Sequence, residues 1–251
     1  MKPNYGIDAP GLVRVFIITT IILLLIGSIF LYFSDLHSWA EWLAIFTFVL
    51  ALYPLGMFCL MIWGSLVTKV ADRELILNLI KWNGDENVLD VGCGRGLMVI
   101  GAARRLTTGH ATGVDIWAAK DQSQNSDTAA LDNAKIEGVA NRITIKTADM
   151  RHLPFTDHSF DVVMSNWVVH NLDAINDRHK ALAEMHRVLK PEGKILLTDI
   201  ENCQEYLGAL GTLGYNEVKL VIFSPLKDRV LKLVSFGSFA PSTIIASQKK
   251  V

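Results

Sequence analysis

The chain has 251 residues, enough for one substantial domain and a smaller element, and its formal net charge of −1 shows no basic excess of the kind that nucleic-acid binding needs. Hydrophobic residues make up 51% of it and charged residues only 20%, with a mean hydropathy of +0.31, which is high for a soluble protein. The three cysteines, Cys59, Cys93 and Cys203, are scattered without a CxxC pair, so neither a disulfide framework nor a cysteine metal site is expected.

Two long apolar runs fill the first third of the chain. Residues 12–33 carry a single charge, Arg14, and residues 42–67 carry none. As helices, both runs are long enough to cross a hydrocarbon core about 30 Å thick. Only residues 34–41 separate them, which forces an antiparallel pair, and Pro54 would bend the second helix as membrane helices tolerate. The sequence therefore predicts a membrane hairpin over residues 1–68, followed by a domain over residues 69–251.

The distribution of basic residues predicts the orientation of this hairpin. Lys2 and Arg14 lie at its start, Lys69 and Arg73 follow it, and the connecting segment has no lysine or arginine. By the positive-inside rule, both ends face the cytoplasm. We therefore expect a multi-pass membrane protein with a cytoplasmic domain. The alternatives are a cleaved signal peptide, two helices buried in a soluble core, and a hairpin inserted in one leaflet.

After residue 68, helix and strand patterns alternate to the end of the chain. Such alternation predicts an α/β domain with a mostly parallel, seven-stranded, Rossmann-like sheet and helices on both faces. Helices are expected at residues 68–84, 95–106, 127–139, 176–190 and 203–215. Strands are expected at residues 87–92, 110–116, 142–149, 159–166, 194–200, 217–224 and 242–250.

Polar residues end five successive strands of this predicted sheet. Parallel strands bind ligands at their carboxyl ends, near the point where the strand order reverses. One polar residue at a strand end means little, but five at the same edge indicate a site. These residues are Asp90, Asp115, Asp149, Asn166 and Asp199.

The stretch VLDVGCGRG, residues 88–96, follows the first strand with glycine at every second position. Glycine permits positive φ and lets a ligand approach the backbone. A dinucleotide motif would have the spacing GxGxxG, but its third glycine would fall here on Leu97. Asp90 would also sit poorly beside a pyrophosphate, whereas it suits a ligand with an ammonium group.

This stretch resembles the first motif of the class I S-adenosylmethionine-dependent methyltransferases. The resemblance continues in GVDIW, in TADMRHLPFTDHSFDVVMSN and in HRVLKPEGKILLTDI, and it covers roughly residues 70–250. It is nearest to the branch of the ubiquinone/menaquinone-biosynthesis and sterol C-methyltransferases. The apolar hairpin is not part of the common pattern of that family.

The resemblance implies S-adenosyl-L-methionine as cofactor and a role for each matching residue in binding its methionine half. Gly92, Gly94 and Gly96 would let the loop pass close to this half. Asp90 would lie near the ammonium group, and Asn166 would lie near the transferable methyl group.

For the adenosine half, the resemblance implies four further contacts. Asp115 would accept hydrogen bonds from both ribose hydroxyls, and Ile116 would pack on the adenine. Asp149 would accept a hydrogen bond from the exocyclic amine of the adenine, with Met150 beside the ring.

Methyl transfer from a sulfonium needs an aligned acceptor, exclusion of water and at most one base. His170, four residues after the fourth strand, is the candidate base, and the alternative is a histidine that caps or packs the loop. No grouping of histidine and carboxylates predicts a metal site. The polar loop of residues 118–127 either covers the cofactor or is solvated.

The acceptor is expected to be small and lipophilic, such as a quinone, an isoprenoid or a lipid. This expectation rests on the hairpin and on residues 225–239, where Leu226, Val230 and Leu233 share a helical face with Lys227 and Lys232 off it. That segment could instead be a surface helix packed on the sheet. Two other functions remain open: a membrane-tethered nucleotide-dependent oxidoreductase, and an inactive methyltransferase fold that acts as a binding subunit.

Overall fold

The computed structural model describes residues 1–118, 120–235 and 241–247, with the side chains of these residues except 225–228. Backbone contacts divide the chain into two compact units. One unit contains the sheet and comprises Met1–Asn4, Val70–Trp117 and Ser126–Val251. The other contains two long helices and comprises Tyr5–Lys69 and Ala118–Asn125.

Within the described residues, seven strands form one sheet in the order β3-β2-β1-β4-β5-β7-β6. Neighbouring strands from β3 to β5 are parallel, whereas β7 is antiparallel to both β5 and β6. The predicted mostly parallel, Rossmann-like sheet is therefore confirmed. The strands are β1 (Asn87–Val91), β2 (His110–Asp115), β3 (Ile143–Thr147), β4 (Phe160–Asn166), β5 (Leu189–Asp199), β6 (Glu217–Val221) and β7 (Ser242–Ser247).

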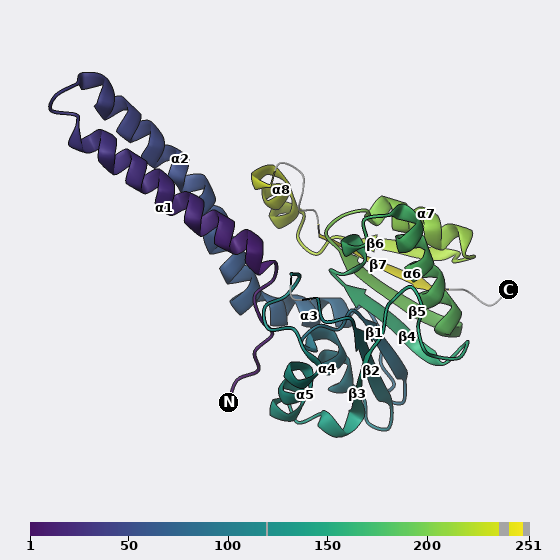
Figure 1. Cartoon of the computed structure of the whole chain (residues 1–251). Coiled ribbons are helices and arrows are strands. Elements are labelled where there is room, and N and C mark those ends of the chain that lie inside the picture. The colour runs from purple at the N-terminus through teal and green to yellow at the C-terminus, as the bar shows by residue number, and fades with distance from the viewer. Residues whose placement is uncertain (119, 236–240, 248–251) are drawn as a thin grey trace. The chain divides into compact units, whose positions relative to one another are not determined.

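Helices cover both faces of this sheet (Figure 1). From β1, the next two strands are added on one side, with β3 at that edge of the sheet. The fourth strand, β4, lies on the other side of β1, and the later strands are added beyond it. Because crossovers between parallel strands are right-handed, this reversal places the helices of the two halves on opposite faces. The point of reversal lies between β1 and β4. The α-helices of this unit are α3 (Lys69–Leu77), whose first residue belongs to the other unit, α4 (Leu97–Ala103), α5 (Asp127–Ile136), α6 (Ile175–Val188), α7 (Cys203–Thr212) and α8 (Pro225–Val234).

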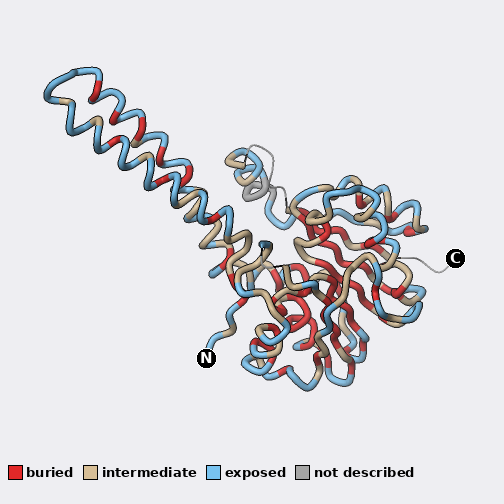
Figure 2. Tube along the Cα trace, viewed as in Figure 1, coloured by how far each residue is buried: buried red, intermediate tan, exposed pale blue. Residues whose placement is uncertain are grey.

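The core of the sheet unit lies along the central strands, where burial is densest (Figure 2). Leu89, Val163 and Leu197 are fully buried, as expected for strands covered on both faces. Met185 of α6 and Tyr206 of α7 close one side of this core with no exposed surface.

Several element ends differ from the prediction by a few residues, and two boundaries differ by more. Helix α3 ends at Leu77 and not at Gly84, and the indole nitrogen of Trp82 donates to the carbonyl of Leu77 at 2.9 Å. Strand β5 begins at Leu189, earlier than the strand start predicted at residue 194, and therefore includes the turn-forming residues 191–193. Glu192 does adopt the positive φ of a turn, 68°, but pairing with β4 continues on both sides of a register shift. The turn residues therefore form an irregularity inside the strand.

The second unit consists mainly of α1 (Pro10–Tyr32) and α2 (Ser38–Trp63), which form an antiparallel pair. A five-residue π-helix, Gly64–Thr68, follows α2. The seam between the two helices is made of small side chains. A Cβ on Gly27 would lie 2.7 Å from the Thr47 hydroxyl, so the two helices approach closely at this point. The buried residues of the pair are Val13, Thr20, Gly27, Ala40, Ala44, Thr47, Ala51 and Pro54.

Large apolar side chains point away from this seam. Both helices are long and apolar enough to cross a membrane. In the most apolar 18-residue stretch of each one, only 11% and 17% of the residues are buried (Figure 2). Length and composition alone do not separate such spans from a signal sequence. Helix α8 covers the first part of the predicted amphipathic segment at residues 225–239. The side chains of Leu226 and Lys227 and residues 236–239 lie outside the described part of the chain.

Candidate active site

The loop between β1 and α4 carries the three alternating glycines. All three have positive φ, 76° at Gly92, 51° at Gly94 and 87° at Gly96. The amides of Gly92 and Cys93 both donate to the carbonyl of Val114 in β2, at 2.8 and 3.0 Å. A Cβ on Gly92 would collide with the side chain of Val168. Glycine is thus required here by backbone conformation and by packing, independently of any ligand.

Asp90 lies in β1 directly before this loop and is only 1% exposed. Its Oδ2 accepts a hydrogen bond from the amide of Val99 at 2.9 Å, while its Oδ1 is buried without a hydrogen-bond partner. Burial raises the pKa of Asp90 to about 8, and the charge of nearby Asp115 contributes to this shift. A buried carboxylate oxygen without a partner is costly, and a cationic ligand group would satisfy it.

Asp115 ends β2 and links two turns. Its Oδ2 accepts from the amide of Gly94 at 2.8 Å, and its Oδ1 accepts from the amide of Trp117 at 2.6 Å. Trp117 has φ of 63°, and its indole nitrogen donates to the Thr147 hydroxyl at 2.8 Å. The intervening Ile116 is 59% exposed. An exposed apolar side chain held between two fixed residues can pack against the face of an aromatic ring.

Asp149 follows β3 and forms an ion pair that the sequence did not predict. Arg151 donates to its two carboxylate oxygens, with the shortest contact at 2.6 Å, and also to Asp177 of α6 at 2.8 Å. The Arg151 side chain lowers the pKa of Asp149, so its carboxylate is charged near neutral pH. The adjacent Met150 is partly buried against the core.

His170 and Asp199 come together at the ends of β4 and β5. Asn166 ends β4 half-buried, and a short helix at Val169–Asn171 follows. His170 Nδ1 lies 2.5 Å from Asp199 Oδ1, and the amide of His170 donates to Asp199 Oδ2 at 3.0 Å. The Asp199 side chain is fully buried, whereas that of His170 is 17% exposed.

Two further donors complete the surroundings of Asp199. The amide of Ile200 donates to Oδ1 at 2.9 Å, and the hydroxyl of Tyr206 donates to Oδ2 at 3.2 Å. Burial, followed by the charge of Asp199, raises the pKa of Tyr206, so this phenol stays neutral and donates. Such a carboxylate fixes the proton of an imidazole on Nδ1 and leaves Nε2 as the basic atom. Chemically, such an arrangement is able to orient a general base.

The sheet therefore brings the predicted residues to one edge. Asp90, Asp115, Asp149 and Asn166 stand at the carboxyl ends of β1 to β4, on either side of the strand reversal. The sequence places Asp199 at a strand end but does not predict its pairing with His170. Nothing in the sequence pattern pointed to Tyr206 or Arg151.

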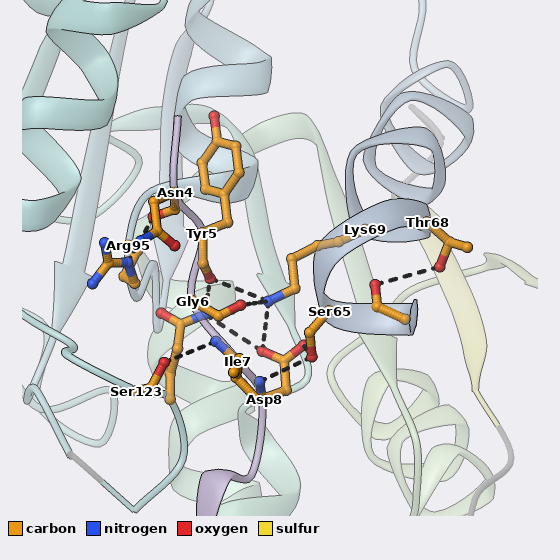
Figure 3. Close-up of polar contacts among 12 residues, drawn as sticks. Asn4, Tyr5, Gly6, Ile7, Asp8, Ser65, Thr68, Lys69, Arg95 and Ser123 are labelled. Atoms are coloured by element: carbon orange, nitrogen blue, oxygen red, sulfur yellow. Dashed lines mark hydrogen bonds and ion pairs between the residues drawn. The ribbon is translucent and has the colours of Figure 1, made fainter. Parts of the chain in front are cut away.

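Most of the polar loop of residues 118–127, predicted either to cover the cofactor or to be solvated, belongs to the helical unit. Its Ser123 amide donates to the carbonyl of Ile7 at 3.0 Å, and the amide of Ile7 donates back to the Ser123 hydroxyl at 2.8 Å (Figure 3). In the same unit, the Lys69 ammonium donates to the Tyr5 and Gly6 carbonyls, at 3.1 Å each, and to Asp8 at 2.8 Å. The loop is thus held by residues 7–9, and its residue 119 lies outside the described part of the chain.

Comparisons with known proteins point to methyltransferases. The family described as a methyltransferase domain matches residues 89–197. A 2-phytyl-1,4-naphtoquinone methyltransferase of Nostoc sp. is 33% identical over 167 residues, which are 65% of this chain and 68% of that protein. The ubiquinone/menaquinone biosynthesis C-methyltransferase UbiE of Geotalea daltonii is 30% identical over 178 residues, which cover 66% of this chain and 72% of that protein.

Coverage is smaller for other curated relatives. Several are matched over 42% to 59% of their own length, so the chain spans about half the length of these proteins. Among solved structures, a geranyl diphosphate methyltransferase in complex with SAM superposes with a TM-score of 0.58 at 17% identity. This match covers 77% of this chain and 91% of that chain, and it supports the fold.

Proposed function

The chain belongs to the class I S-adenosylmethionine-dependent methyltransferases, in the ubiquinone/menaquinone methyltransferase branch, and on this premise we propose that it methylates a small lipophilic acceptor at a membrane. The observation that carries the proposal is the buried Oδ1 of Asp90, which has no partner beside a loop of three positive-φ glycines. This pair of features fits an amino acid with a cationic group.

The residues at the sheet edge fit S-adenosylmethionine group by group. Asp90 would hold its ammonium, beside the loop of Gly92, Gly94 and Gly96. Asp115, already fixed by two backbone amides, would accept from the ribose hydroxyls. The remaining proposed contacts are Ile116, Met150 and Asp149 around the adenine and Asn166 near the methyl group.

Once bound, this cofactor supplies a methyl group that a sulfonium has already activated for in-line displacement. The protein's task is then to align the acceptor and remove its proton. We assign this proton transfer to His170 Nε2, because Asp199 holds the opposite ring nitrogen at 2.5 Å. A hydroxyl or enol of the acceptor would lose its proton to Nε2 as the new bond to the methyl carbon forms.

A lipophilic acceptor is supported by two independent observations. Relatives at 33% and 30% identity are named as methyltransferases of a phytyl naphthoquinone and of ubiquinone/menaquinone biosynthesis. The chain also carries two helices with the length and composition of membrane spans. We therefore propose a membrane hairpin over residues 1–68 and a cytoplasmic methyltransferase domain over residues 69–251, which takes its acceptor from the bilayer.

Labelled-methyl transfer tests this function. Purified full-length protein in lipid nanodiscs is given methyl-labelled cofactor with either a prenylated naphthoquinol or a water-soluble phenol. We expect label in the prenylated acceptor and loss of labelling with Asp115→Ala, but not with Asp132→Ala, an exposed residue that pairs with Lys135 in α5. Preference for the soluble phenol would refute the lipophilic acceptor.

Binding measurements separate the two other functions. Calorimetry with S-adenosylhomocysteine and with a reduced nicotinamide nucleotide distinguishes a methyltransferase from an oxidoreductase. Heat with the nucleotide alone would refute the proposal. Binding of S-adenosylhomocysteine without any turnover on total membrane lipids would favour the inactive binding subunit.

A further inference from the structure

Asn133 of α5 forms a buried hydrogen-bond network with the start of the chain. The residue is 3% exposed. Its Oδ1 accepts from the amide of Asn4 at 2.8 Å, and its Nδ2 donates to the carbonyls of Asn4 and Arg95, at 2.9 Å each. One amide side chain thus fixes the backbone of residue 4 to the glycine loop, within the sheet unit.

Arg95 lies between Gly94 and Gly96 in that loop, and its side chain also contacts the Asn4 carbonyl. Its Nε donates to the carbonyl of Asn4 at 2.7 Å, and the whole residue is only 7% exposed (Figure 3). Burial lowers the pKa of Arg95, which reflects the cost of removing a guanidinium from water. The Asn4 carbonyl therefore accepts from two donors and offsets part of this cost.

The position of this cation matters because of the charge of the proposed ligand. S-adenosylmethionine carries a sulfonium, an ammonium and a carboxylate, so its net charge is +1, whereas S-adenosylhomocysteine lacks the sulfonium and is neutral overall. A guanidinium released into the loop would repel the first ligand more than the second. A change that only loosened the fold would weaken both ligands alike.

We infer that Asn133 and the N-terminal segment, through Asn4, are positioning elements that hold the Arg95 guanidinium away from the positively charged cofactor. This inference rests on the proposed function. It gives the first residues of the chain a role in discriminating the cofactor from its demethylated product. Asn133 acts through Arg95 and is not itself expected to touch the ligand.

The experiment compares the dissociation constants of the two ligands in full-length protein in nanodiscs. The variants are Asn133→Leu and a deletion of residues 1–4 that keeps an initiating methionine, each also combined with Arg95→Met. Asn141→Leu, at an exposed position, is the matched control. If Asn133→Leu does not fold, the same two dissociation constants are compared in the deletion variant, in which α5 is unchanged.

We expect the ratio of the two constants, S-adenosylmethionine over S-adenosylhomocysteine, to rise about tenfold in Asn133→Leu and in the deletion, as unit charges within several ångströms predict. With Arg95→Met present, the same changes should leave the ratio at the value measured for Arg95→Met alone. A ratio that does not change, or a rise that persists without Arg95, would overturn the inference while the proposed function stands. Wild-type protein that binds neither ligand would refute both.

Discussion

At the scale of single residues, the proposed role of Asp90 predicts that cofactor binding depends on pH. Burial raises its pKa to about 8, so the free protein holds this carboxyl mostly protonated at pH 7. An ammonium group favours the ionised form, so binding should release a proton, and affinity should increase as pH rises from about 6 to about 8. Calorimetry at pH 7 in buffers of different ionisation enthalpy should show release of close to one proton per S-adenosylhomocysteine bound. Asp90→Asn should bind more weakly and without proton release; release that persists would contradict the assignment.

The contact of Asp199 with His170 leads to a separate prediction about the rate of the chemical step. Replacing it with asparagine would present an amide donor to His170 Nδ1, which shifts the imidazole proton to Nε2 and removes the base. We expect kcat to fall by about 10² to 10⁴, with the cofactor dissociation constant nearly unchanged. Tyr206→Phe, which removes one donor and keeps the ring, should cost about tenfold or less. A loss of cofactor affinity and thermal stability at unchanged kcat would show that Asp199 is only structural.

The two aspartates also show which residues the sequence could predict. Asp90 and the glycines lie within nine residues of one another, so their local pattern carries their geometry. His170 and Asp199 are separated by 29 positions, and their contact depends on β4 lying beside β5. The pair of Asp149 with Arg151 is close in sequence, but a charged residue near an aspartate does not by itself predict a bidentate contact. To predict which side chains pair across two strands, the register of those strands must be known, and no sequence motif specifies it.

At the scale of elements, the packing of α4 against α3 depends on one glycine. A Cβ on Gly101 would lie 2.6 Å from both Arg73 Cδ and Leu77 Cδ1, and both of these residues are buried. Arg73 cannot move aside easily, because Glu137 and Glu74 hold its guanidinium at 3.2 and 2.9 Å. Gly101→Ala should therefore destabilise the protein by about 1–3 kcal/mol.

A second glycine provides the control for this element. An added Cβ on Gly208, inside α7, would meet nothing within 4 Å. Gly208→Ala should raise stability by about 0.5–1 kcal/mol through helix propensity. Thermal unfolding of purified protein in one detergent should place the two midpoints on opposite sides of wild type. A neutral Gly101→Ala would mean that the α3–α4 packing is looser than its distances indicate.

The same elements show where pattern reading fails at boundaries. Helix and strand order follow from alternating periodicity, and the seven strands appear where the pattern expects them. The pattern predicts the start of β5 too late because Pro191 and Gly193 are turn residues, and the pairing of Leu189 with Phe160 overrides them. The pattern predicts the end of α3 too late because Trp82 continues the apolar spacing after Leu77, although its indole instead donates to the Leu77 carbonyl.

At the scale of the whole molecule, a hairpin that spans the bilayer and one that lies in a single leaflet place the turn between α1 and α2 on different sides of the membrane. The seam of small residues lets α1 and α2 pack closely while large apolar side chains face outward, as expected for helices in lipid. A spanning hairpin puts the turn after α1, with the exposed Asp35, on the outer side. A hairpin in one leaflet keeps that turn away from the outer side.

Cysteine accessibility distinguishes the two arrangements. Asp35→Cys and Asn141→Cys are made in a Cys59→Ser background, because Cys59 is exposed on α2, whereas Cys93 is buried and Cys203 half-buried. With a membrane-impermeant maleimide on intact cells, we expect labelling at position 35, and labelling at position 141 only after permeabilisation. If both positions need permeabilisation, the hairpin does not span, although the acceptor could still come from the inner leaflet. If position 141 reacts first and position 35 does not, the basic residues at Lys2, Lys69 and Arg73 do not set the orientation as the positive-inside rule predicts.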